Sequence, residues 1–540
     1  MTFVSNPGHA APLQLEYWKR HLANHPDQEF SSRLIQQIRD GVSIGYQGNE
    51  FFNVCDNWPS SETYRSKVRE NILANAAKGR LDGPYYAPPH KYFRGSPLGA
   101  FPKKRSEKIR VIHDLSWPPG ASINEFINKH DYTVSFATID QAVALCAKYE
   151  TPWLTKTDLK DAYMHVKVKP SERHLLGFVW DEPDKVSGEM VREYWQMCVL
   201  PFGLTSAPKL FNDLADGLQY IMIQNGASED LIHYLDDYFA VDGNENAGKN
   251  TKSVMKKSIK ESGMDAQDEK TLGPFRCLEF LGIVFDTIKK ELRISEERLC
   301  EIKQSLKDWG RRKVCTKRDL LSLLGKLIFC ARVIRDGRKF VGRIIDLSKK
   351  VKQLNHKVKL NNQAQADIAW WSACLESHNG VSMFPEEWSI TESLVLYTDA
   401  SDLAAGGVCN NSWFVVPFQD HNDWMASMDI AWRELYAVVV CIATFGKRLT
   451  GSKVSMQIDN QAICYCVNSG KSKNPKIMAL IRALYYYTSF HHIDYKAFYL
   501  STKENYVADA ISRLEFRALK ELQPDIENVP VPPETVILDF

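Results

Sequence analysis

Residues 232–241 read IHYLDDYFAV, and two adjacent aspartates, Asp236 and Asp237, stand there between apolar and aromatic residues. DLIHYL and YFAV each have the composition of a β-strand, so the aspartates fall at the turn of a predicted hairpin. One aspartate would be ordinary at a turn, because its short side chain bonds the local backbone. Two carboxylates between apolar strands repel each other and are costly to desolvate, a penalty that a divalent cation removes. Clustered carboxylates without histidine or cysteine indicate Mg²⁺ and phosphoryl chemistry.

A third carboxylate and two further blocks accompany this pair in a fixed order. WLTKTDLKDAYMHVKV (153–168) predicts a strand that runs into a turn near Asp158. LPFGLTSAP (200–208) lies between that turn and the aspartate pair, and KKRSEKIRVIHDLS (103–116) precedes both. A Y-x-D-D string alone is weak support, since roughly 0.1 chance occurrences are expected in a chain of this length. The order of the blocks is what discriminates.

These blocks resemble the fingers and palm of reverse transcriptases over about residues 95–350. SPLGAFPKK, LPFGLTSAP, YLDD and FLGIVFD, followed by LLSLLGKLIFCARV and ADIAWWSACLESHNG, are most similar to retrotransposons of the gypsy and DIRS types. The DIRS type, which integrates with a tyrosine recombinase, is favoured. The resemblance implies a multidomain fold of the α/β and α+β classes, with the fingers, palm and thumb of a right-hand polymerase.

The resemblance also implies roles for particular residues. Asp158, Asp236 and Asp237 would bind two Mg²⁺ ions, which Mn²⁺ can replace. Tyr163 matches the steric gate that excludes a ribose 2′-hydroxyl, although an ordinary sheet aromatic is the alternative. The other matches are a phosphate clamp at Lys103 (or its neighbour Lys104) and Arg110, backbone amides for the triphosphate at Asp161 and Ala162, and Phe202 near the incoming nucleotide, where retroviral enzymes often carry glutamine.

A second set of four acids lies in the C-terminal part of the chain, where strand and helix patterns alternate from about Ser393. Two acids end predicted strands and one lies near the start of a predicted helix, which are the places where an α/β sheet presents a site. This pattern resembles the ribonuclease H of retroelements over residues 393–515 and implies a second pair of divalent ions. The four acids are Asp399 in YTDAS, Glu434 in WRELYA, Asp459 in QIDNQ and Asp509 in VADAIS.

One feature of cellular ribonucleases H is missing from this pattern. Those enzymes have a mobile histidine before the last acid, and FYLSTKENYVAD contains none. His491 and His492 lie before a predicted strand and are interpreted as structural or surface residues. We expect an active domain, with a catalytically dead hybrid-binding domain as the alternative.

Composition limits the remaining possibilities. The chain has 540 residues, 44% hydrophobic and 25% charged, which predicts several soluble domains. No run of 18 apolar residues offers a membrane span, and MTFVSNPGHA has no signal-peptide pattern. Twelve scattered cysteines indicate a reducing compartment and no zinc site. We therefore expect an intracellular protein, cytoplasmic and/or nuclear, that is not secreted.

Lysine and arginine recur between Lys303 and Lys357 on a stretch with helical apolar spacing. A solvated helix face is the ordinary explanation of such a run. Its persistent excess of positive charge also suits a small helical domain that lies along a phosphate backbone. We predict an N-terminal extension (1–75) that braces the fingers or contacts a partner, fingers and palm (76–295), a basic helical thumb (296–350), a connector (351–392), a ribonuclease H domain (393–515) and an extended C-terminal tail (516–540).

The function predicted from these patterns is RNA-directed DNA synthesis coupled to ribonuclease H cleavage. Its partners would be an RNA template, a DNA primer, the RNA–DNA hybrid and deoxynucleoside triphosphates, with an element-encoded coat protein or recombinase as further candidates. Two alternatives stay open: a host-adopted polymerase for DNA-templated repair, and a non-catalytic packaging protein that binds hybrids. The sequence does not decide the oligomeric state.

Overall fold

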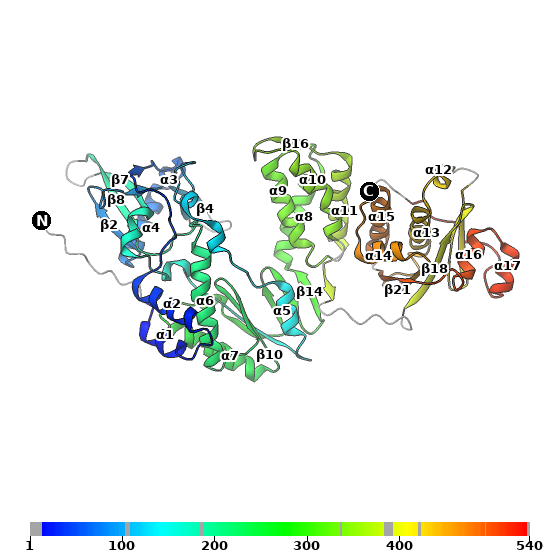
Figure 1. Ribbon diagram of the computed structural model, residues 1–540, viewed down its shortest axis with the longest axis horizontal. Helices are drawn as coiled ribbons and strands as arrows, with labels where there is room; N and C mark the ends of the chain where they lie inside the picture. Colours follow the sequence, from blue (N-terminus) through cyan, green and yellow to red (C-terminus); the bar gives the residue numbers. More distant parts are fainter. Residues whose placement is uncertain are drawn as a thin grey trace. The chain divides into compact units, whose positions relative to one another are not determined.

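The computed structural model describes residues 13–102, 109–183, 188–334, 337–377, 379–382, 393–418, 423–491 and 493–536 (Figure 1). By their internal contacts the residues form two compact units. The first comprises Met1–Leu281 and Phe285–Lys289, and the second comprises Gly282–Val284 and Lys290–Phe540. Helices and strands alternate throughout both, so the predicted mixture of α/β and α+β structure is confirmed.

The predicted hairpin at the aspartate pair lies in a four-stranded sheet of the first unit. Residues Tyr238, Phe239, Ala240 and Val241 of its central strand are completely buried, because helices pack on this sheet. The order is β11–β6–β10–β9. The elements are β6 (Trp153–Asp158), β9 (Leu231–Tyr234), β10 (Asp237–Asp242), β11 (Leu272–Phe275), and the helices α5 (Ile139–Cys146), α6 (Ala207–Gln224) and α7 (Glu245–Glu261).

A second, five-stranded sheet of this unit has the order β1–β3–β7–β8–β2, and a separate hairpin pairs β4 with β5. An ion pair between Arg69 of α4 and the buried Glu193 of β8 ties a helix to this sheet. The elements are β1 (Asn53–Val54), β2 (Leu81–Tyr85), β3 (Arg94–Gly95), β4 (Leu98–Pro102), β5 (Ile109–His113), β7 (Gly177–Pro183), β8 (Met190–Met197), α3 (Pro59–Thr63) and α4 (Arg65–Ala77).

The N-terminal helices α1 (Leu15–Leu22) and α2 (Gln28–Asp40) pack against α6. Trp18 is fully buried and its Nε1 donates to the Ser262 carbonyl oxygen at 3.0 Å. Gly217 of α6 provides the space, because a Cβ there would lie 2.5 Å from Leu34. Helices α3 and α4, in contrast, contact β4 and β2. Residues 13–75 therefore divide between the two sheets of this unit.

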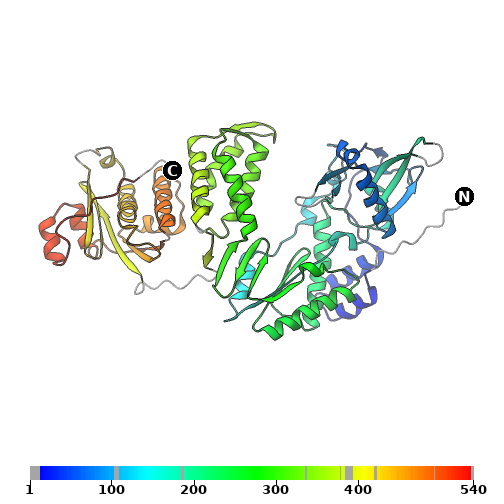
Figure 2. The ribbon, with the colours of Figure 1, turned by 180° about the vertical axis from the view of Figure 1, so that it is seen from behind.

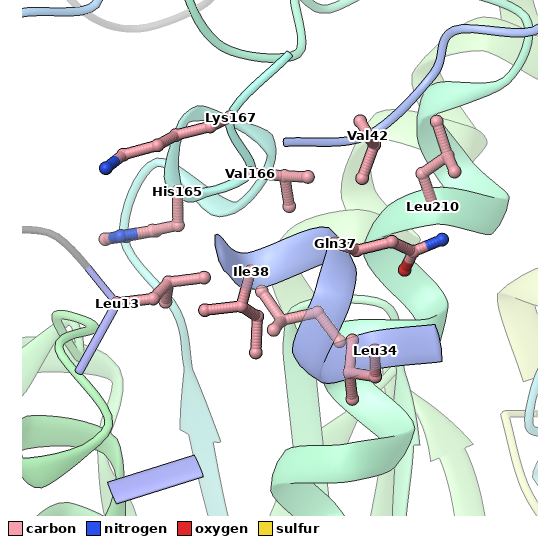
Figure 3. Close-up of a pocket in the computed structure, with 10 residues that line it drawn as sticks. Leu13, Leu34, Gln37, Ile38, Val42, His165, Val166, Lys167 and Leu210 are labelled. Carbon is pink, nitrogen blue, oxygen red and sulfur yellow. The ribbon is translucent and has the colours of Figure 1, made fainter. Parts of the chain in front are cut away.

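A small cavity of about 20 Å³ remains where α2 meets the rest of the unit. Figure 3 shows Leu34, Gln37 and Ile38 of α2 beside Val166 and Leu210 around it. The Gln37 Oε1 atom is buried there without a hydrogen-bond partner among the described residues. A cavity of this size has room for about one water molecule, although most of its lining residues are apolar.

The second unit begins with a helical region. Helix α11, which includes the buried Trp371, packs on α8 and α10, so the segment predicted as a connector supplies a helix to this bundle. Thr316 and Asp319 form a capping box that starts α9. The elements are β14 (Glu291–Ile294), β17 (Val381–Ser382), α8 (Glu296–Gly310), β15 (Val314–Thr316), α9 (Lys317–Cys330), α10 (Gly342–Lys349), β16 (Lys357–Lys359) and α11 (Asn362–Ser377). Strand β12 (Cys277–Phe280) belongs to the first unit, and β13 (Ile283–Asp286) is divided between the two units.

The C-terminal part is a five-stranded sheet of order β20–β19–β18–β21–β22 in which β18, β21 and β22 run parallel. Helices α13 and α15 lie on one face of it and α16 on the other, as both ribbon views show (Figures 1 and 2). The elements are β18 (Leu394–Ala400), β19 (Ala404–Cys409), β20 (Ser412–Pro417), β21 (Lys453–Ile458), β22 (Asp494–Tyr499), α12 (Asp423–Ala426), α13 (Ile430–Phe445), α14 (Gln461–Ser469), α15 (Pro475–Phe490), α16 (Tyr506–Ser512) and α17 (Phe516–Leu522).

The prediction of an extended tail is wrong at its start, where Phe516–Leu522 is helix α17. Leu519 and the following Ile526 are buried in a cluster with Trp413 and Ile511, and this burial stabilises the helix. Residues 523–536 contain neither helix nor strand, as expected, and residues 537–540 lie outside the described part. Within the described ranges, no helix is long and apolar enough to cross a membrane.

Candidate active sites

The first three acids come together at one end of two neighbouring strands. Strand β6 ends at Asp158, the antiparallel strand β10 begins at Asp237, and these two residues are paired in register. The Leu159 amide donates to the Asp236 carbonyl oxygen at 2.9 Å. The sequence folds this way because the apolar residues of β10 fill the core up to the aspartates, where burial stops being favourable.

Burial governs the electrostatics of these acids. The pKa of Asp237 is raised to about 7, chiefly by desolvation; the charge of Lys156 opposes the shift, and the nearby Asp158 and Asp236 carboxylates add to it. The pKa of Asp236 is also raised, first by burial and then by Asp158. The Asp237 Oδ1 atom is buried without a hydrogen-bond partner among the described residues. A bound cation would offset both the desolvation and the mutual repulsion of these acids.

Two partners of Asp158 were not predicted from the sequence. Gln267 Nε2 donates to Asp158 Oδ1, and Lys270 Nζ lies 3.1 Å from Asp158 Oδ2. Both residues are more than 100 positions away along the chain, with separations of 109 and 112. No pattern in AQDEKT marks them, so only the three-dimensional fold could find them.

The turn between β9 and β10 carries a bulky residue in the left-handed region, Leu235 with φ +53°. Such a conformation is unfavourable for leucine and is common at functional sites. His233 connects this turn to α6: its Nδ1 lies 3.2 Å from the Leu235 carbonyl oxygen and its Nε2 lies 2.9 Å from Asp216 Oδ1. No pattern in the sequence indicates these contacts of His233.

The predicted nucleotide-binding residues fall into three groups. Asp161 adopts a left-handed turn just after Asp158, and the buried Ala162 begins the 3-10 helix η3 (Ala162–His165). The Tyr163 ring lies 5.0 Å from the exposed Phe202 ring, and burial raises the Tyr163 pKa to about 12, with Asp236 adding to the shift. Tyr163 therefore lies near Asp236, with Phe202 packed against it and Asp161 and Ala162 just before it in the chain.

Of the two residues of the predicted phosphate clamp, only Arg110 lies among the described residues. Arg110 is exposed on β5, paired in register with Phe101, and the described residues show no contact between it and the three aspartates. Lys103 lies outside the described residues, as does its alternative Lys104.

The second set of acids is assembled from four elements. Asp399 lies near the end of β18, and Asp459 directly follows the neighbouring parallel strand β21, so both reach the same edge of the sheet. Glu434 comes from α13 and Asp509 from α16, the helices on opposite faces.

Mutual repulsion and burial act on this second set as well. Burial raises the pKa of Asp399 to about 7; Ser512 opposes the shift by donating from Oγ to Asp399 Oδ2 at 2.6 Å, and Asp459 and Asp509 add to it. Burial likewise raises the pKa of Glu434 to about 7, with Asp459 and Asp399 contributing. Glu434 Oε2 and Asp459 Oδ1 are buried without partners among the described residues.

Smaller contacts orient the remaining acids. Arg513 Nε donates to Asp509 Oδ1 at 2.8 Å, and Thr502 Oγ1 donates to Asp459 Oδ2 at 3.2 Å. His491 packs against Gly446, where an added Cβ would lie 2.3 Å from its ring, so a structural role suits it. His492 is outside the described residues.

Both sets fit a hard divalent cation by their chemistry. They offer carboxylate oxygens, several of them buried without partners among the described residues, and burial raises the pKa of Asp237, Asp399 and Glu434, a desolvation cost that a cation would offset. Among the described residues, no group of three or more histidine, cysteine, aspartate or glutamate side chains is arranged closely enough to define a metal position.

Comparisons with known proteins agree with this geometry. Residues 102–285 match the family model described as reverse transcriptase (RNA-dependent DNA polymerase), and residues 389–487 match that of the RNase H-like domain found in reverse transcriptase. The first segment contains Asp158, Asp236 and Asp237, and the second contains Asp399, Glu434 and Asp459. Asp509 lies beyond it.

Curated polyproteins of transposons are related to this chain in sequence. The Tf2-3 transposon polyprotein of Schizosaccharomyces pombe is 23% identical over 328 residues, covering 59% of this chain and 21% of that protein. The Pol polyprotein from transposon gypsy of Drosophila melanogaster is 24% identical over 388 residues, covering 70% of this chain and 34% of that protein. The chain thus spans about a fifth to a third of the length of these curated relatives.

Structures of foamy viral protease-reverse transcriptase are also similar. The one in complex with double-stranded DNA has a TM-score of 0.48 at 14% identity, covering 93% of this chain and 84% of that chain. The one with an RNA/DNA hybrid has a TM-score of 0.47 at 14% identity, covering 99% and 66%. Each segment that matches a family model contains acids of the corresponding predicted site. The chain therefore carries a reverse transcriptase domain followed by an RNase H-like domain, and its sequence is related to the Tf2 and gypsy retrotransposon polyproteins.

Proposed function

We propose that this chain is an RNA-directed DNA polymerase with ribonuclease H activity, which copies retroelement RNA into DNA and degrades the RNA strand of the resulting hybrid. The observation that carries the proposal is the register of Asp158 against Asp237 on β6 and β10, inside the segment that matches the reverse transcriptase family. A second, separate set of acids in the RNase H-like domain supports the second activity.

In the polymerase site, Asp158, Asp236 and Asp237 would hold two Mg²⁺ ions. Bound there, the ions supply a lowered pKa at the primer 3′-hydroxyl and neutralise charge on the triphosphate, and Mn²⁺ can replace them. The backbone amides of Asp161 and Ala162 bind the triphosphate oxygens, with Lys103 and Arg110 as further phosphate contacts.

Selection of deoxynucleotides over ribonucleotides in this site would come from the packed ring of Tyr163. The Tyr163 ring packs on Phe202 at 5.0 Å and on Phe211 at 5.5 Å between ring centroids, which fixes its position. A ring held in this way blocks the space of a ribose 2′-hydroxyl and so favours deoxynucleotides. An exposed Phe202 face is available to pack near the incoming nucleotide.

In the RNase H site, Asp399, Glu434, Asp459 and Asp509 would hold two divalent ions, which activate water against an RNA phosphate. Contacts to 2′-hydroxyls across the wide minor groove would select the RNA strand. The loop before Asp509 contains Thr502 but no histidine, so the domain would cleave without the mobile histidine of cellular ribonucleases H.

Several finer assignments belong to the same proposal. We keep the predicted domain boundaries except in the connector, whose helix α11 is assigned to the helical bundle of the thumb. The basic residues of the thumb would grip the nucleic-acid backbone without reading sequence. The motif blocks favour a DIRS-type element, with an element-encoded coat protein or recombinase as partner. No disulfide joins the cysteines of the described residues, which supports a reducing, cytoplasmic or nuclear location.

The test is extension of an end-labelled DNA primer on matched RNA and DNA templates, with Mg²⁺, with Mn²⁺ and with a chelator. We expect synthesis on the RNA template that requires a divalent ion, followed by shortening of a labelled RNA strand. Hybrid binding without synthesis under any of these conditions would instead identify a packaging protein. Synthesis restricted to the DNA template would identify a repair polymerase.

A further inference from the structure

Asp161, the residue that begins the predicted triphosphate cradle, has an unfavourable backbone conformation. Its φ is +55° and its ψ is +35°. Aspartate tolerates this region mainly when its side chain bonds the neighbouring backbone. Here the side chain caps no backbone group of the 3-10 helix η3 that follows. A contact from elsewhere must therefore hold the residue.

That contact comes from Arg80. Its Nη1 donates to Asp161 Oδ2 at 2.9 Å, and the Arg80 side chain is only 11% exposed, against 37% for Asp161. Burial raises the pKa of the Asp161 carboxyl, but the hydrogen bond and charge of Arg80 bring it below its usual value. Lys78 Nζ is 4.0 Å from the same oxygen on a side chain that is 53% exposed, so it contributes less.

Arg80 is itself fixed in place by its backbone. Its amide donates to the Asn75 carbonyl oxygen at 2.9 Å, and its carbonyl accepts from the Cys198 amide at 2.9 Å. It lies between α4 and β2, 81 residues before Asp161. A buried ion pair seldom adds net stability. The Arg80–Asp161 pair instead connects the residue just before β2 to the turn that carries Asp161.

We propose that Arg80 is a positioning residue for the incoming nucleotide. By holding the Asp161 carboxylate it keeps the turn in the conformation that aims the Asp161 and Ala162 amides at the triphosphate and sets the start of the helix that carries Tyr163. This inference rests on the proposed polymerase function and assigns a residue to it. Arg80 acts through Asp161 and does not contact the nucleotide.

A double-mutant cycle on KM for the deoxynucleotide tests this role, because glycine adopts positive φ without a side-chain support. In the Asp161 background, Arg80→Ala should raise KM by roughly tenfold with a smaller effect on kcat, since left-handed geometry is unfavourable for aspartate. In the Asp161→Gly background, the same Arg80→Ala change should leave KM within about twofold of that background, as expected for an interaction that has already been removed.

The controls separate positioning from folding and from direct binding. Arg69→Ala removes an arginine whose partner is Glu193 of β8, away from the turn, and should not change KM. Arg80→Lys keeps one donor and should give an intermediate KM. If thermal melting shows that Arg80→Ala does not fold, the change in KM for the deoxynucleotide is measured with Arg80→Lys in both Asp161 backgrounds.

The outcomes are distinguishable. An equal increase of KM in both backgrounds would show that Arg80 contacts the nucleotide directly and would overturn the inference. A loss of kcat with unchanged KM would reduce Arg80 to a structural residue and overturn it as well. Absence of any synthesis by the wild-type chain would overturn the proposed function, and the inference with it.

Discussion

Asp158 and Asp237 lie directly opposite each other on the antiparallel strands β6 and β10. Paired residues of antiparallel strands have Cα atoms about 4.5–5.5 Å apart. Two ions in a shared site sit about 4 Å apart, so carboxylates at this separation can contact both. Distant segments of the chain thus meet at a spacing that is compatible with the proposed pair of ions.

Asp236→Asn should abolish primer extension and leave hybrid cleavage intact. The substitution removes a charged ligand oxygen from the first site, and a loss of more than about a hundredfold is expected, because changes that only orient a ligand already cost that much. Asp140→Asn, an exposed aspartate on α5, is the control and should extend primers normally. Equal loss of both activities in Asp236→Asn would contradict separate sites.

Asp399→Asn should have the opposite effect. Asp399 is buried beside Asp459 and Asp509, and its loss removes a ligand from the RNase H site only. We expect cleavage of a labelled RNA strand to fall by more than about a hundredfold while DNA synthesis continues. The exposed Asp525→Asn serves as the matched control. Loss of synthesis along with cleavage would show that the two domains depend on each other.

The acids and their strands could be predicted because alternation, strand ends and block order are local in sequence. Asp158, Asp236 and Asp399 can be recognised in the sequence because each is a charged residue next to an apolar strand. Gln267, Lys270 and Arg80 do not, since each reaches its partner from 81 to 112 residues away, and such contacts depend on the whole topology. Helix α17 was missed for the same reason: Leu519 is helical because Trp413 and Ile511 cover it.

Tyr163→Ala should admit ribonucleotides. Removing the ring that packs on Phe202 and Phe211 opens the space for a 2′-hydroxyl, and we expect the preference for deoxynucleotides to fall by about tenfold to a hundredfold. Tyr163→Phe keeps the ring and should keep the preference. The measurement is the ratio of kcat/KM for matched ribo- and deoxynucleotides. An unchanged ratio in Tyr163→Ala would remove the steric-gate assignment.

Trp18→Ala should weaken the polymerase unit. Trp18 is fully buried against α6 and donates to Ser262, so its truncation should cost about 3–5 kcal/mol of unfolding free energy. Primer extension should be lost at a lower temperature, whereas hybrid cleavage should keep its thermal profile. Trp117→Ala, at a tryptophan that is 41% exposed, is the control. An unaltered inactivation temperature would mean that the N-terminal helices are dispensable to this unit.

His113 should make the contact between β5 and β7 sensitive to acid. Burial lowers the pKa of His113 to about 4, its Nε2 donates to the Gly177 carbonyl oxygen at 3.0 Å, and its Nδ1 is buried without a partner among the described residues. The unfolded state, with a histidine pKa of about 6.5, therefore binds more protons than the folded state between about pH 4 and 6.5. The part of the unfolding free energy that depends on a neutral His113 is fully present above pH 6.5 and is lost as the pH falls towards 4.

The loss attributable to His113 should reach about 2 kcal/mol at pH 5, and His113→Gln, which keeps a donor and cannot be protonated, should not show it. Hydrogen exchange of the β7 amides, corrected for intrinsic rates, measures the opening free energy at pH 7.5 and pH 5 in both proteins. The wild type should lose protection that the variant retains. Parallel losses in the two proteins would place the acid sensitivity in other groups, among them the neighbouring Asp114, whose charge opposes the shift of the His113 pKa.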